Sequence, residues 1–157
     1  TINGFRRFQA NSLAPDRATW SHDHRGVMVR VLGGVGDPAT RYENRIGEPA
    51  ANPYLYIASQ IIAGLDGIER GAEPCPANDE PYESDRPMLP TRMEDALALL
   101  ADSALFGEAL GPLYRDYFIA LKQAELARYT QYLEDNPERD DVNGVTFWEQ
   151  NEYFDFF

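Results

Sequence analysis

Residues 27–45 read VMVRVLGGVGDPATRYENR, and this stretch decides the fold class. Residues 27–32 have the apolar, β-branched composition of a buried strand, which two glycines end. Residues 33–39 form a Gly/Pro turn, and residues 40–45 alternate in the manner of a second strand. Because the connection is short, we expect an antiparallel pair rather than a parallel crossover.

Helical signals follow the strands. Asn52 can cap a helix from about Pro53 to Arg70, with proline at its first position. Further helices are predicted over about 91–102, 103–110, 112–134 and 146–157. Thr91 and Thr146 each begin a capping-box pattern, and Ser103 is a further cap.

The order of these elements predicts the domain organisation. Strands at about 18–46 precede helices at about 53–157, an α+β arrangement in one domain of residues 1–157. Residues 71–90 are rich in proline and acidic residues, and we expect them to form a long exposed loop.

Charge is distributed unevenly along an acidic chain. The net charge is -12, which argues against nucleic acid as the main partner. Residues 1–45 nevertheless contain seven arginines against four acidic residues. Arginine presents a planar fork for carboxylates and phosphates, so this first third is predicted to hold an anionic ligand.

Other features of the sequence indicate where in the cell the protein is expected. No apolar run is long enough to span a bilayer, no signal peptide is evident, and no membrane partner is expected. The single cysteine, Cys75, cannot form an internal disulfide, which predicts a cytoplasmic protein. The chain begins at Thr1 rather than at a methionine, and we expect it to be a fragment.

Alternating charges mark the second strand. Arg41, Glu43 and Arg45 would share one face of it, where they could hold a phosphate, a metal and a carboxylate side by side. A surface ladder of salt bridges is the alternative. Arg25 and Arg30 are five positions apart and cannot share a face of a regular strand, so one of them must sit at the start of the strand.

Several blocks, in order and with matching spacing, closely resemble the C-terminal catalytic region of glutamine synthetases. They are NGFRR at 3–7, Ala14-Pro15, RGVMVR at 25–30, RYENR at 41–45, EPAANPYL at 48–55 and AGLDGI at 63–68. The resemblance implies an ATP-dependent ligase that activates glutamate as γ-glutamyl phosphate and joins it to an amine.

The resemblance also implies roles for the arginines nearest the phosphates. Arg25 matches the arginine that stabilises the phosphoryl group during transfer. Arg30 and Arg41 match residues on the ATP phosphates. Phosphoryl transfer needs positive charge around the moving group, which agrees with these roles.

Three further residues are implied to bind metal or glutamate. Glu43 matches a carboxylate that binds a divalent metal, Mg²⁺ or Mn²⁺. Arg7 and Arg45 match arginines that hold the carboxylate of glutamate.

Departures from the family pattern concern the amine. Leu13 stands where glutamine synthetases carry a glutamate that closes the ammonium site, and His24-Arg25-Gly26 replaces Asn-Arg-Ser or Asn-Arg-Thr. These changes resemble the γ-glutamyl-amine ligases, including γ-glutamylpolyamine and γ-glutamylanilide synthetases. An apolar residue suits the carbon skeleton of an organic amine, so we expect Leu13 and His24 to contact such a substrate, with ammonia as the alternative. His22 and His24 could instead ligate a metal, although such a pair more often lines a pocket or is solvated.

The resemblance further implies parts that would precede Thr1. The remaining metal ligands and an N-terminal domain belong there, and the full enzyme would be a homo-oligomeric ring. We therefore expect the isolated chain to be inactive. The alternatives are a family member that lost catalysis and serves a structural or regulatory role, and an unrelated anion-binding module.

Overall fold

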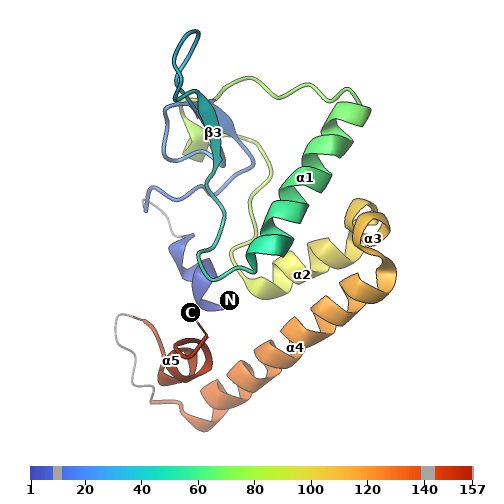
Figure 1. The fold of residues 1–157 in the computed structure, drawn as a ribbon. Coiled ribbons are helices and arrows are strands. Elements are labelled where there is room, and N and C mark those ends of the chain that lie inside the picture. Colours follow the sequence, from blue (N-terminus) through green and yellow to red (C-terminus); the bar gives the residue numbers. More distant parts are fainter. Residues whose placement is uncertain (9–11, 139–143, 157) are drawn as a thin grey trace. The chain divides into compact units, whose positions relative to one another are not determined.

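The computed structural model describes residues 1–8, 12–138 and 144–156. The chain divides into two compact units, one formed by Arg6–Thr91 and one by Thr1–Phe5 with Arg92–Phe157. The first unit contains the strands and the second contains most of the helices (Figure 1). This α+β content confirms the predicted fold class.

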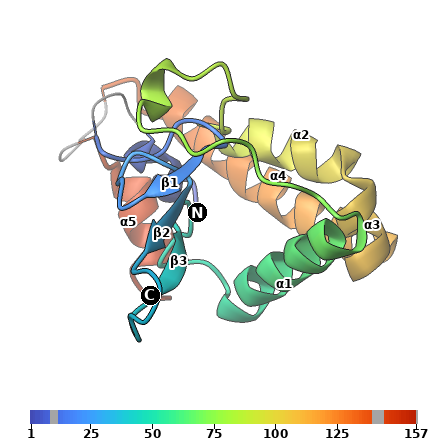
Figure 2. The same cartoon turned by 90° about the horizontal axis from the view of Figure 1, so that it is seen from above.

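Three short strands form the sheet of the first unit. They are β1 (Trp20–His22), β2 (Val29–Leu32) and β3 (Arg41–Asn44), in the order β1-β2-β3 (Figure 2). The β2–β3 pair is antiparallel, as predicted, and places Arg30 opposite Glu43.

The parallel pairing of β1 with β2 was not predicted. It arises because the chain turns between the two strands, from Asp23 onward. Asp23 adopts a left-handed φ of 49°, and its backbone N–H donates to the Val31 carbonyl at 2.9 Å. Strand β2 therefore begins at Val29, two residues later than the strand predicted to start at Val27, and Val27 itself is fully buried.

Helix α1 (Pro53–Glu69) follows the sheet. The Asn52 side chain accepts from the backbone N–H groups of Tyr54 and Leu55, at 3.0 and 3.3 Å, which confirms the predicted cap. One row of apolar side chains on α1 is exposed: Tyr54, Ile57, Ile61, Leu65 and Ile68.

The Pro-rich segment after α1 is mostly exposed, as predicted, but it is also bound to the sheet unit. It contains a short 3₁₀ helix, η2 (Pro81–Glu83), whose Pro81 is buried. Backbone bonds join Asn78 to Trp20, Pro87 to Ala18 and Leu89 to Asp16, at 2.9, 3.0 and 2.7 Å. The segment thus runs along residues 16–20 as a fixed strap.

Four helices make up most of the second unit. They are α2 (Met93–Asp102), α3 (Ala104–Leu110), α4 (Pro112–Asp135) and α5 (Phe147–Tyr153). Both α2 and α3 pack on α4, and α2 lies alongside it in both views (Figure 1, Figure 2). The predicted helices are present, although α5 ends at Tyr153 rather than continuing to the end of the chain. No helix in the described residues has both the length and the apolar character needed to cross a membrane.

Buried polar groups join the N-terminal residues of this unit to its C-terminal helices. Asn3, the first residue of the 3₁₀ helix η1 (Asn3–Arg7), donates to the buried Glu149 carboxylate at 3.2 Å. Tyr153 accepts from the Ile2 backbone N–H and donates to Glu125. Burial alone would raise the pKa of Glu125, but hydrogen bonds from Lys122 and Tyr153 lower it overall.

Only one of the two predicted capping boxes forms. At α5 the Thr146 hydroxyl accepts from the Glu149 N–H, and the Glu149 carboxylate accepts from the Thr146 N–H. The box predicted at Thr91 is wrong, because α2 begins at Met93 and its N-cap is Arg92, which makes no side-chain capping bond. Arg92 is extended, so Thr91 lies one position too far from the helix to cap it.

These two threonines therefore make a matched test of stability. Thr146→Ala is expected to lower the free energy of unfolding by about 1–3 kcal/mol, because it removes a cap and leaves buried Glu149 short of donors. Thr91→Ala should change it by less than about 0.5 kcal/mol. Urea denaturation measures both, and equal losses would contradict the structure.

Candidate functional site

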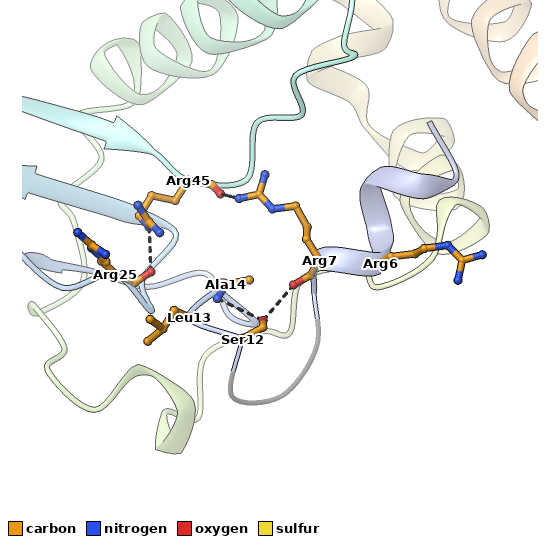
Figure 3. A pocket seen from close by; sticks show the side chains of 7 residues that line it. All are labelled: Arg6, Arg7, Ser12, Leu13, Ala14, Arg25 and Arg45. Carbon is orange, nitrogen blue, oxygen red and sulfur yellow. Dashed lines mark hydrogen bonds between the residues drawn. The ribbon is translucent and has the colours of Figure 1, made fainter. Parts of the chain in front are cut away.

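A pocket of about 480 Å³ opens in the sheet unit (Figure 3). Its lining consists of Arg6, Arg7, Ser12, Leu13, Ala14, Arg25 and Arg45. Arg6, Arg7, Arg25 and Arg45 line the pocket together with Leu13, and Arg6 extends away from Arg25 and Arg45 in Figure 3. The described lining residues include no carboxylate, and their guanidinium groups favour an anionic ligand.

Two of these arginines are held by backbone carbonyls. Arg7 donates through Nη1 to the Gly47 carbonyl at 2.6 Å and through Nη2 to the Arg45 carbonyl at 2.7 Å. Arg45 in turn donates through Nε to the Arg25 carbonyl at 2.8 Å. These bonds fix the two side chains in the pocket wall. Each guanidinium group has further N–H donors that these bonds do not use.

Arg25 differs from its neighbours. It is exposed and lies in the turn between β1 and β2. Among the residues that the structure describes, its guanidinium group has no hydrogen-bond or ion-pair partner. No described residue therefore competes with a bound anion for its donors.

Leu13 forms the apolar part of the lining. It adopts a left-handed φ of 56° and is 56% exposed, whereas the following Ala14 and Pro15 are buried. Ser12 holds the turn, since its hydroxyl donates to the Arg7 carbonyl at 3.0 Å. A left-handed conformation costs a non-glycine residue about 1 kcal/mol, and such strain is concentrated at functional sites.

A second cluster of charges adjoins the pocket on β2 and β3. Glu43 lies 3.3 Å from Arg30, 3.4 Å from Arg41 and 3.7 Å from Arg45. Arg30 also donates to Asp23, and this hydrogen bond is the main cause of its raised pKa. The predicted common face of Arg41, Glu43 and Arg45 therefore exists, and Arg45 links it to the pocket.

Neither histidine is among the lining residues of the pocket. The His24 ring accepts from the Gly26 backbone N–H at 3.0 Å through Nδ1, so it stabilises the turn that carries Arg25. His22 packs edge-on against Trp20, with ring centroids 5.6 Å apart.

Sequence reasoning missed three lining residues: Arg6, Ser12 and Ala14. They lie on a 3₁₀ helix and in a loop, which have no periodic pattern to indicate the direction of a side chain. Arg6 and Ala14 belong to the blocks that resemble glutamine synthetases, whereas the only signal for Ser12 was its adjacency to Leu13.

Comparisons with known proteins identify the family of the chain. The family model described as glutamine synthetase, catalytic domain, matches residues 1–139. The chain belongs to the glutamine synthetase family. A γ-glutamylanilide synthase from Acinetobacter sp. is 48% identical over 155 residues, which are 98% of this chain and 31% of that protein.

Two further relatives show the breadth of the family. A glutamine synthetase from Pyrococcus horikoshii is 36% identical over 163 residues, covering 98% of this chain and 36% of the relative. The solved structure described as apo GmaS without ligand has a TM-score of 0.70 and 31% identity, over 99% of this chain and 33% of that one. The chain thus spans about a third of the length of these relatives, and it fits the γ-glutamyl-amine ligase branch of the family.

The family implies a divalent metal, and the charges around Glu43 test whether one would fit. In residues 1–8, 12–138 and 144–156, no group of three or more His, Cys, Asp or Glu side chains could hold a metal ion. Glu43 is surrounded by guanidinium groups, which repel a cation. The described residues therefore do not make a metal site by themselves. If a metal bound here, Glu43 would be one of its ligands and the others would come from elsewhere.

Proposed function

We propose that this chain is the C-terminal portion of the catalytic domain of an ATP-dependent ligase that joins the γ-carboxyl group of glutamate to an organic amine. The single observation that carries the proposal is the pocket in which Arg7, Arg25 and Arg45 lie beside Leu13. It offers cationic donors for anionic groups and an apolar surface for a carbon skeleton. The names of the relatives, a γ-glutamylanilide synthase among them, support the same reaction class.

The proposed roles follow from how free each arginine is. No described residue engages the Arg25 guanidinium group, which suits a phosphoryl group whose charge develops during transfer. Arg7 and Arg45 are fixed by backbone carbonyls, which suits the carboxylate of glutamate, because a rigid fork loses little entropy on binding. Arg30 and Arg41 would contact the phosphates of ATP from the adjoining cluster.

We further propose that Mg²⁺ or Mn²⁺ is bound with Glu43 as one ligand and the other ligands from residues outside this chain. Leu13 would contact the amine, and His24 would hold the turn beside it. A homo-oligomeric ring is proposed for the whole protein, and the exposed apolar row on α1 supports an extended contact surface.

Turnover by the intact ligase tests this function. With ATP, glutamate and a divalent cation present, phosphate release is expected to be at least about tenfold faster with primary amines than with ammonium, because Leu13 offers ammonium neither charge nor acceptors. The isolated 157-residue chain should release none.

The results separate the alternatives. Ammonium used far better than every amine would contradict the organic acceptor. No phosphate release with any acceptor would favour a structural or regulatory family member.

A further inference from the structure

Tyr82 comes from a segment distant in sequence and contacts Ala14, a lining residue of the pocket. It lies on η2, within the strap that runs along residues 16–20. The buried Pro81 anchors η2 on one side. Asp79, just before it, accepts a hydrogen bond from the Ser21 hydroxyl. The position of the Tyr82 ring is therefore determined by its surroundings rather than by free rotation of a loop.

The Tyr82 side chain contacts Ala14, which lines the pocket, and Gly26, which follows the lining residue Arg25. Its hydroxyl donates to the Ala14 carbonyl at 3.2 Å, directly after Leu13. Its ring also lies against Gly26, directly after Arg25: a Cβ atom built at Gly26 would be 2.8 Å from the Tyr82 hydroxyl and 2.9 Å from Cζ. Burial raises the pKa of Tyr82, with Asp16 adding to the effect, so the hydroxyl stays protonated and able to donate.

Space, and not backbone conformation, explains the glycine at position 26. Its φ is outside the left-handed region, so other residues could adopt its backbone conformation. A side chain there would displace the Tyr82 ring or the His24 ring, whose Cε1 would be 3.0 Å from it. The glycine thus leaves room for the tyrosine.

We propose that Tyr82 is a positioning residue that holds the Leu13–Ala14 wall of the pocket against the Arg25–Gly26 turn, and that Gly26 is required to admit it. This inference rests on the proposed function in one respect, namely that the amine binds beside Leu13. Loss of the Tyr82 hydrogen bond would loosen the Leu13 turn while leaving the contacts of Arg7 and Arg45 in place.

A double-mutant cycle in the intact protein tests the packing half of the proposal. Gly26→Ala is expected to lower the melting temperature by several degrees when Tyr82 is present. The same change should have much less effect in a Tyr82→Ala background, because the clash is then relieved. Equal shifts in the two backgrounds would overturn the coupling. The cycle needs no turnover, so its failure is distinct from a failure of the proposed ligase activity.

Tyr82→Phe tests the positioning half with the ring kept in place. We expect the KM for a primary amine to rise about two- to tenfold, the effect of one hydrogen bond, with the KM for glutamate and the melting temperature nearly unchanged. Tyr42→Phe is the matched control, since Tyr42 is exposed on β3, and it should change none of the three. An unchanged amine KM, or equal changes in both KM values, would refute a positioning role for Tyr82.

Discussion

Arg25→Ala is expected to lower kcat of the intact ligase about a thousandfold, the largest effect of any substitution in the pocket. The reason is that the Arg25 guanidinium group has no partner among the described residues and is free to meet charge that develops on a transferring phosphoryl group. The KM values for glutamate and amine should change little. Single-turnover phosphate release measures the loss.

Two variants control for this result. Arg25→Lys keeps the charge but loses the fork, and we expect it to recover only part of the rate. Arg70→Ala removes an exposed arginine that pairs with Asp66 on α1, far along the chain from the pocket residues, and should keep wild-type kcat. A kcat for Arg25→Ala within about threefold of wild type would show that this arginine does not act on the reacting group.

Leu13→Glu is expected to shift the ratio of kcat/KM for ammonium over primary amine about a hundredfold towards ammonium. A carboxylate at this position supplies the negative charge and acceptors that ammonium needs, and it removes the apolar contact with a carbon skeleton. The side chain is about half exposed, so stability should change little. Competition between labelled ammonium and an amine measures the ratio directly.

Leu13→Met keeps an apolar side chain of similar volume and should retain the preference for amines. Leu13→Gly separates strain from specificity. It removes the cost of the left-handed conformation and should keep the protein at least as stable, while the KM for the amine rises. An unchanged preference in Leu13→Glu would show that another residue selects the acceptor.

Local signals predicted the helices well because the signals and the contacts lie within one turn. Asn52, Ser103 and Thr146 each cap the helix that follows them. Thr91 has the same pattern and does not cap α2, because the conformation of Arg92 places the threonine outside the reach of the first N–H groups. A capping motif therefore predicts well that a helix lies nearby. It predicts less well which residue begins that helix.

The pairing of the strands could be predicted from sequence patterns only in part. The antiparallel β2–β3 pair followed from a short glycine-rich connection. The parallel pairing of β1 depends on a left-handed residue at Asp23, and an aspartate in a sequence does not reveal its φ. The same turn lifts Arg25 out of the strand and into the pocket.

By itself, the sequence determined the α+β class, the hairpin that aligns Arg41, Glu43 and Arg45, and the resemblance that the family match confirms. These features depend on neighbours in the chain and on spacing. Only the tertiary structure decided that Arg7 is fixed by carbonyls of residues 45 and 47, that His24 lies outside the pocket lining, and that Gly26 makes room for Tyr82. Those contacts join segments about 40 to 70 residues apart or set the direction of a loop side chain, and no periodicity encodes them.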